Sequence, residues 1–173
     1  VYFDSEKVSA EGTYIHPELA LKESVGANLE PPKKHETWTI YAADGSVINV
    51  LNYSEGEKHG TFKIFLPDGT LTQTGSYHQG SKDGEWVSWF ESGQLKERVN
   101  YDQGLLDGVS EHYWNNGRIK SKGHYIDGNE DGAFQFFLEN GLTEVVYMYR
   151  DGERVEEEDL YFNGTFVDWF GED

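Results

Sequence analysis

The sequence predicts an all-β fold, an elongated array of stacked antiparallel β-hairpins in a single twisted sheet. The first observation is a 24-residue period, because three successive stretches between Gly60 and Asp131 align without a gap at their glycine, aromatic and tyrosine positions. The second is composition: aromatic residues make up 15% of the chain and methionine occurs once, so apolar burial depends on rings and β-branched side chains, which favour strands. A fixed repeat of this length indicates units that contact only their neighbours.

Five units of the repeat span residues 36–155. Their bounds are 36–59, 60–83, 84–107, 108–131 and 132–155. A turn glycine recurs at Gly45, Gly69, Gly93, Gly117 and Gly141. A tyrosine recurs at Tyr53, Tyr77, Tyr101, Tyr125 and Tyr149, three residues before a second glycine at Gly56, Gly80, Gly104, Gly128 and Gly152. An opening glycine stands at Gly60, Gly84, Gly108 and Gly132, with Glu36 in its place in the first unit. Pairs such as Asp68-Gly69 lie between β-rich runs, so each unit is predicted to be one hairpin.

Two segments flank the repeats. Residues 1–35 are predicted to be an irregular N-terminal segment and a decayed repeat, because Gly12 and Tyr14 lie 48 residues before Gly60 and Phe62. Two consecutive prolines at 31–32 mark its end. Residues 156–173 are predicted to be a C-terminal capping hairpin, since an acidic approach suits a terminal edge that must not add another strand.

Pairing each hairpin outward from its turn sorts the side chains onto two faces. In the third unit, this pairing sets Phe90 opposite Leu95, Ser88 opposite Glu97, Trp86 opposite Val99 and Gly84 opposite Tyr101, with the tyrosine ring packed over the glycine. One face is then an apolar core face. It carries Trp38, Ile40, Phe62, Ile64, Leu66, Trp86, Phe90, Trp114, Phe134, Phe136 and Leu138, together with Val47, Leu71, Leu95 and Ile119.

The opposite face is polar except for one file of aromatic residues, which we call the aromatic ladder. Its members are Tyr41, Phe65, Trp89, Tyr113 and Phe137, with Lys63, Glu111, Gln135, Lys96 and Lys120 flanking them. Rungs are two strand spacings apart, about 10 Å. The ladder is the candidate interaction surface, since exposed rings among polar groups anchor partners. The alternative, which we favour, is that sheet coiling, the N-terminal segment or the stems of Lys96 and Lys120 bury these rings.

The charge balance excludes several classes of partner. Lys and Arg total 14 against 32 Asp and Glu, a net charge of -18, which repels nucleic acid and anionic lipid headgroups. The charge keeps an edge-rich β protein soluble, or it complements a basic surface on another protein. No apolar run approaches a membrane span. Because the chain starts at Val1, a leader or anchor ahead of it is expected, which favours a lipoprotein of the bacterial cell envelope; a cytoplasmic location stays open.

The side chains that could carry chemistry do not form a recognisable catalytic pattern. Cysteine is absent, and no nucleophile elbow, phosphate loop or dinucleotide fingerprint occurs. The six histidines have no metal-ligand spacing. Asp83, Asp107 and Asp131 recur and could form a carboxylate ladder for Ca²⁺, but Asp-Gly also suits the connections between hairpins. The prediction is a protein that is not an enzyme and has no metal or cofactor.

The repeat itself resembles a known family. Its consensus is clearest at Gly84, Trp86, Trp89, Gly93, Leu95, Tyr101 and Gly104. This pattern is similar to the MORN repeat, in particular the bacterial variant of YwqK-family antitoxins. Departures are Glu36, Ser110 and Thr143. The resemblance implies a grooved sheet of hairpins that binds or scaffolds another protein, in an antitoxin-like or cell-envelope assembly role. The alternative is a glycan- or cell-wall-binding repeat protein that uses the ladder.

Overall fold

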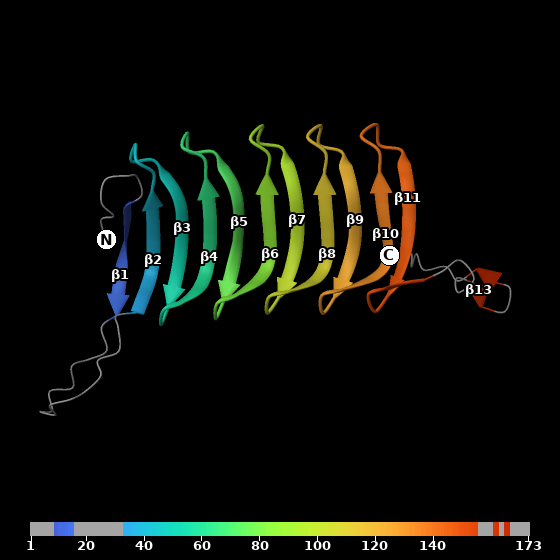
Figure 1. Ribbon diagram of the computed structural model, residues 1–173, viewed down its shortest axis with the longest axis horizontal. Helices are drawn as coiled ribbons and strands as arrows, with labels where there is room; N and C mark the ends of the chain where they lie inside the picture. The colour runs from blue at the N-terminus through green and yellow to red at the C-terminus, as the bar shows by residue number, and fades with distance from the viewer. Residues whose placement is uncertain (1–8, 16–32, 156–160, 163–164, 167–173) are drawn as a thin grey trace, which may run out of the picture. The chain divides into compact units, whose positions relative to one another are not determined.

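The computed structural model describes residues 9–15, 33–155, 161–162 and 165–166, and each regular element in them is a β-strand (Figure 1). Twelve antiparallel strands form one sheet in chain order. Their bounds are β1 Ser9–Ile15, β2 Lys33–Tyr41, β3 Val47–Ser54, β4 Glu57–Phe65, β5 Leu71–His78, β6 Ser81–Trp89, β7 Leu95–Asp102, β8 Leu105–Tyr113, β9 Ile119–Ile126, β10 Asn129–Phe137, β11 Thr143–Arg150 and β12 Glu153–Arg154. The predicted all-β class and its hairpin repeat are confirmed.

The chain divides into two compact units, 1–81 and 82–173, and both use the same two kinds of turn. In the first unit the loops at 42–46 and 66–70 lie at one end of the strands, and the turns at 55–56 and 79–80 lie at the other (Figure 1). Both residues of the short turns have positive φ, 52° at Glu55 and 91° at Gly56, which defines a type I′ turn. This turn matches the twist of paired strands.

The longer loops explain the turn-glycine column and its preceding polar residue. Gly45 donates its amide hydrogen to the Ala42 carbonyl (3.0 Å), and the Asp44 carboxylate accepts the Ser46 amide hydrogen (2.9 Å). Asp68, Asn116 and Asn140 make the same bond two residues ahead. Short turns at 79–80, 103–104 and 127–128 connect successive hairpins. Asp83, Asp107 and Asp131 come after these turns and lie inside β6, β8 and β10. The interpretation of these aspartates as connection residues is therefore wrong.

The opening glycine lies opposite the tyrosine as predicted, but the position requires glycine for a different reason. Gly84 lies opposite Tyr101, and Gly60 lies opposite Tyr77. A Cβ on Gly84 would meet nothing within 4 Å, so the tyrosine ring does not need the glycine for room. Gly84 instead has a φ of 70° and Gly60 a φ of 83°. The backbone of any residue other than glycine is strained in this region. The backbone conformation at this point of the strand selects glycine.

The tyrosines pack against the aromatic residues of the core face. Trp38 and Phe62 in the first unit, and Trp86 and Phe134 in the second, are each less than a tenth exposed. Tyr77 meets Phe62 edge-on at 5.8 Å between ring centroids, and Tyr101 meets Trp86 at 6.1 Å. Such edge-to-face pairs add about 1 kcal/mol beyond the area they bury. The tyrosine column therefore stabilises each hairpin through its neighbouring ring.

A lysine column completes this packing, and sequence reasoning missed it. Lys34, Lys58 and Lys82 recur at the 24-residue period. The Lys82 Nζ lies 4.4 Å from the centroid of Trp86 and 4.5 Å from that of Tyr101, whose hydroxyl accepts its hydrogen bond (3.2 Å). Lys34 lies over Trp38 at 4.4 Å. The stems of these lysines cover the rings, and their ammonium groups gain cation–π attraction.

Part of the predicted irregular N-terminal segment is ordered, because Ser9–Ile15 pair with β2 as β1. Tyr14 lies opposite Lys34, as Tyr53 lies opposite Lys58. Tyr14 is therefore equivalent to Tyr53, which lies in the second strand of its hairpin. The predicted register, in which Gly12 and Tyr14 are equivalent to Gly60 and Phe62, is wrong. Gly12 accommodates Trp38, since a Cβ there would lie 2.4 Å from the ring. Residues 1–8 and 16–32 lie outside the described part of the chain.

The C-terminal cap stays a prediction, because most of 156–173 lies outside the described residues. Within it, β13 (Tyr161–Phe162) pairs with β14 (Thr165–Phe166), and these two strands form a sheet of their own. In the described stretches we find no helix with the length and apolar character needed to span a membrane.

Candidate functional site

A β-bulge beside each long loop decides which residues share a face with the aromatic ladder. The predicted pairs of Trp86 with Val99 and Ser88 with Glu97 are confirmed, but Trp89 lies opposite Leu95, and Lys96 is the extra residue in β7. The prediction of Phe90 opposite Leu95 is wrong by this one residue. The same shift pairs Tyr41 with Val47, Phe65 with Leu71, Tyr113 with Ile119 and Phe137 with Thr143.

The bulge moves four aliphatic residues from the predicted core face to the ladder face. Val47, Leu71, Leu95 and Ile119 each lie directly across from a ladder ring, which contradicts their assignment to the core face. Each ladder ring is the last residue of its strand, and all five rings are half-buried. We define the ladder face as the face that carries these rings. Four of its five rungs are aromatic–aliphatic cross-strand pairs, a type that stabilises sheets, and the fifth pairs Phe137 with Thr143.

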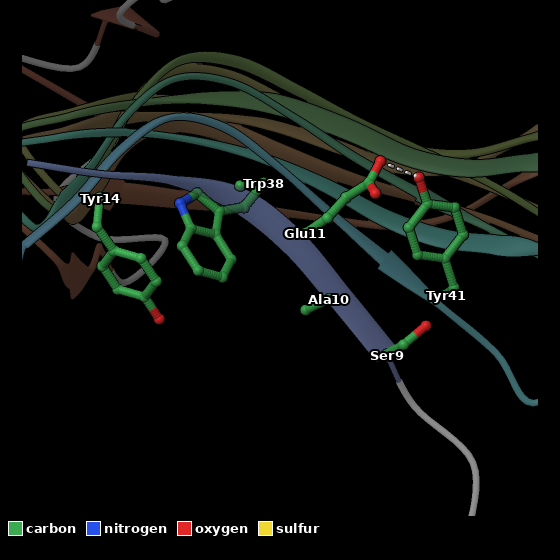
Figure 2. Close-up of a pocket in the computed structure, with 7 residues that line it drawn as sticks. Ser9, Ala10, Glu11, Tyr14, Trp38 and Tyr41 are labelled. Carbon is green, nitrogen blue, oxygen red and sulfur yellow. Dashed lines mark hydrogen bonds between the residues drawn. The ribbon is translucent and has the colours of Figure 1, made fainter. Parts of the chain in front are cut away.

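The two ladder tyrosines have engaged hydroxyl groups. Tyr41 donates to Glu11 Oε1 at 2.7 Å, and Figure 2 shows the Glu11 side chain turned toward that ring. This hydrogen bond raises the pKa of Tyr41 above its ordinary value, with desolvation adding to it. Tyr113 donates to Glu111 Oε2 at 2.7 Å. Burial raises the pKa of Tyr113 most, and Glu111 raises it further. Both tyrosines therefore stay protonated at neutral pH and act as donors.

The lysines predicted to cover the ladder lie elsewhere. Lys96 lies 5.9 Å from the centroid of Phe90, and Lys120 lies 4.7 Å from that of Trp114, so their stems pack on rings outside the ladder. Arg98 is a cation on the ladder face of the second unit. It lies 3.6 Å from Glu85 and 3.7 Å from Glu111. Exposed ion pairs of this kind contribute at most about 1 kcal/mol each.

A groove of about 480 Å³ opens on the ladder face of the first unit. It lies beside the loops 42–46 and 66–70 and is lined by Ser46, Val47, Val50, Phe65, Pro67, Asp68 and Gly69. Its apolar walls come from the valines, the ladder ring and the proline. Hydrogen bonds from Thr70 lower the pKa of Asp68, and bonds from Ser46 lower that of Asp44, so both carboxylates are ionised at neutral pH.

A second cavity of about 250 Å³ lies at β1 in the first unit (Figure 2). It is lined by Ser9, Ala10, Glu11, Gly12, Tyr14, Trp38 and Tyr41. Figure 2 shows the Tyr14 and Trp38 rings on one side of β1, with the Glu11 side chain directed to Tyr41 on the other. Tyr14 meets Trp38 edge-on at 4.8 Å. Trp38 is only 3% exposed, so a ligand in this cavity would reach no more than the edge of its ring.

Outside the ladder, the structure brings together titratable groups that the sequence did not single out. His59 and His78 meet edge-on at 5.2 Å between centroids. Ser110 Oγ lies 3.4 Å from His112 Nε2, and His112 Nδ1 lies 3.5 Å from Glu97. Ser110 is only 5% exposed, so its hydroxyl is poorly placed to attack a substrate. Among the residues that the structure describes, no three His, Asp or Glu side chains cluster closely enough to hold a metal ion.

These features define an all-β hairpin-repeat protein with an aromatic ladder on one face. Three consecutive stretches, 58–79, 82–103 and 106–127, match the family described as MORN repeat variant. These three stretches thus match MORN-type repeats, as the sequence pattern indicates. No curated protein matches. A crystal structure of TarM is similar at 15% identity and a TM-score of 0.35, over 68% of this chain and 20% of that one; likeness at this level carries no functional argument.

Proposed function

We propose that this protein is a non-enzymatic binding module that presents its ladder face to another protein. The observation that supports this most is the repeated rung: in both units a half-buried ring ends one strand and lies opposite an aliphatic or threonine residue on the next. A face with regularly placed apolar anchors among polar groups suits a protein partner. An antitoxin-like or cell-envelope assembly role belongs to this proposal, as does a partner with a basic surface.

Two observations favour a protein partner over a glycan. A sugar stacks on the open face of a ring, whereas all five ladder rings are half-buried. The hydroxyl hydrogens of Tyr41 and Tyr113 are also already donated to carboxylates, so neither is available to a sugar oxygen. The net charge of -18 opposes nucleic acid and favours a basic protein surface.

The test is affinity capture with the tagged full chain in an extract, identification of a stoichiometric protein, and measurement of binding with that partner purified. Trp89→Ala and Tyr113→Ala should each weaken binding by tenfold or more, which is typical of an aromatic anchor at an interface. The control is Leu105→Ala, because Leu105 is 52% exposed and lies at a short turn away from the ladder. Binding that survives both ladder substitutions would exclude the ladder as the interface.

A glycan array with the same three variants addresses the alternative. Wild-type binding to a polysaccharide that both ladder substitutions remove, without any stoichiometric protein partner, would replace this proposal by the glycan-binding function.

A further inference from the structure

The groove beside Phe65 is lined by a valine at a position where two hairpins of the second unit have longer, cationic side chains. Two repeats further along the chain, Arg98 holds the position of Val50 and reaches Glu85 and Glu111. Lys122 holds that position in the next repeat. Val50 has no such arm and lines the groove with its methyl groups. The apolar wall at this position is therefore set by this hairpin's own sequence.

The loops of the second unit are also bridged by side chains. Ser92 Oγ donates to Asn115 Oδ1 at 2.8 Å, and Asn116 Nδ2 donates to the Glu139 carbonyl at 2.9 Å. In the first unit, Pro67 holds the position of Asn115. A proline offers neither a side-chain acceptor nor an amide donor for such a bridge. Pro67 lines the groove instead and adds apolar surface.

Charge indicates what flanks an apolar side chain in this groove. Asp68 lines the groove at its loop end, and Asp44 holds the equivalent place one loop earlier. Lys63 lies opposite Val50 but is not part of the lining, so attraction for a cation is concentrated at the loops. A second copy is disfavoured as the occupant, because two chains that each carry a net charge of -18 repel one another.

We propose that this groove takes a bulky apolar side chain of a partner peptide, with lysine or arginine residues next to it that meet Asp44 and Asp68. The inference rests on the proposed function and names the chemistry of the partner. Apolar anchors seated in a pocket and flanked by complementary charges provide both affinity and orientation. The anchor contacts Val47, Val50 and Phe65, and the flanking cations contact the loop carboxylates.

The probe is a fluorescein-labelled peptide, Gly-Lys-Lys-Phe-Lys-Lys-Gly, measured by fluorescence anisotropy with the full chain. Two matched peptides replace the phenylalanine by glycine or all four lysines by glutamate. We expect each replacement to weaken binding at least about tenfold, since one removes the anchor and the other the charge complementarity. Equal binding of all three peptides, or no binding of the first, overturns the inference.

Three variants locate the site. Val50→Arg introduces the arm found in the second unit and should weaken peptide binding about tenfold. Thr74→Arg is its control, because it adds the same charge at the equivalent position one hairpin later without lining the groove. Asp68→Asn keeps the loop acceptor, as Asn116 does, and should weaken binding about threefold while reducing its salt dependence. Equal affinities of Val50→Arg and Thr74→Arg, whether high or low, overturn the inference.

Sedimentation of the wild-type chain tests the competing occupant. A dimer that Val50→Arg dissociates would assign the groove to a second copy and overturn the inference. The groove inference can fail while the proposed function holds. A captured partner that no longer binds Trp89→Ala but still binds Val50→Arg would support the ladder as the interface and exclude the groove as a binding site.

Discussion

Glu36 lies opposite Tyr53 with a φ of 58°, the same left-handed backbone conformation that Gly84 adopts opposite Tyr101 with a φ of 70°. The first repeat therefore keeps the backbone geometry of the others although it lacks their opening glycine. A residue with a Cβ in this conformation costs about 1 kcal/mol or more. Glu36 therefore introduces local backbone strain, which the remaining interactions of the hairpin offset.

Glu36→Gly should therefore stabilise the protein by about 0.5–1 kcal/mol, because relief of the left-handed strain exceeds the entropy that glycine adds to the unfolded chain. Urea unfolding measures the change. Thr37→Gly is the control: Thr37 lies in the same strand without a positive φ, and glycine there should destabilise by about 1 kcal/mol. A loss of stability in Glu36→Gly would show that its hydrogen bond with Thr13 outweighs the strain.

Gly123→Ala should be among the most damaging single-methyl changes in the second unit. A Cβ there would lie 2.3 Å from Cε1 of Phe134, so the ring must move, at a cost of about 2–3 kcal/mol. Gly132→Ala is the matched control, since its Cβ meets nothing within 4 Å and only its φ of 75° is penalised, by about 1–2 kcal/mol. Thermal unfolding compares them, and equal losses would contradict close contact between Gly123 and Phe134.

Tyr113 should make stability fall at alkaline pH. Burial and the Glu111 carboxylate raise its pKa in the folded state above the ordinary value of 10.0, so the folded chain keeps a proton that the unfolded chain releases. Its contribution is complete below pH 10.0 and is lost as the pH rises through the folded pKa. The ultraviolet absorbance of tyrosinate, wild type minus Tyr113→Phe, should show this residue titrating above 10.0. Titration at or below that value would contradict the hydrogen bond to Glu111.

Lys82→Ala should destabilise the protein by about 1–2 kcal/mol, because its ammonium lies over two rings and its stem covers them. Lys96→Ala is the control, since Lys96 lies farther, at 5.9 Å, over a single ring. Its loss should be about 0.5 kcal/mol or less. Chemical unfolding distinguishes the two, and Lys82→Met should recover the part that comes from the stem. Similar losses for both alanine variants would show that the lysine column is only a surface feature.

Much of the hairpin geometry could be predicted because each repeat carries its own local signals. Asp-Gly and Asn-Gly pairs specify loops, and alternation along the strands placed Trp86 opposite Val99 and Gly84 opposite Tyr101 correctly. The site was predicted less well. The ladder rings were identified by their period, but the four aliphatic residues opposite them were assigned to the wrong face, and the groove beside Phe65 was not foreseen.

The sequence by itself determined the repeat length, the strand content and the position of each turn, since these depend on residues close together in the chain. Only the tertiary structure decided the face of Leu95, the reason for Gly84 and the place of Tyr14. A bulge adds one residue to one strand, and because side chains alternate with a period of two, the residue between the bulge and the loop lies on the opposite face from the one that uninterrupted alternation predicts. Nothing local in the chain marks where the extra residue falls; the pairing of neighbouring strands settles it.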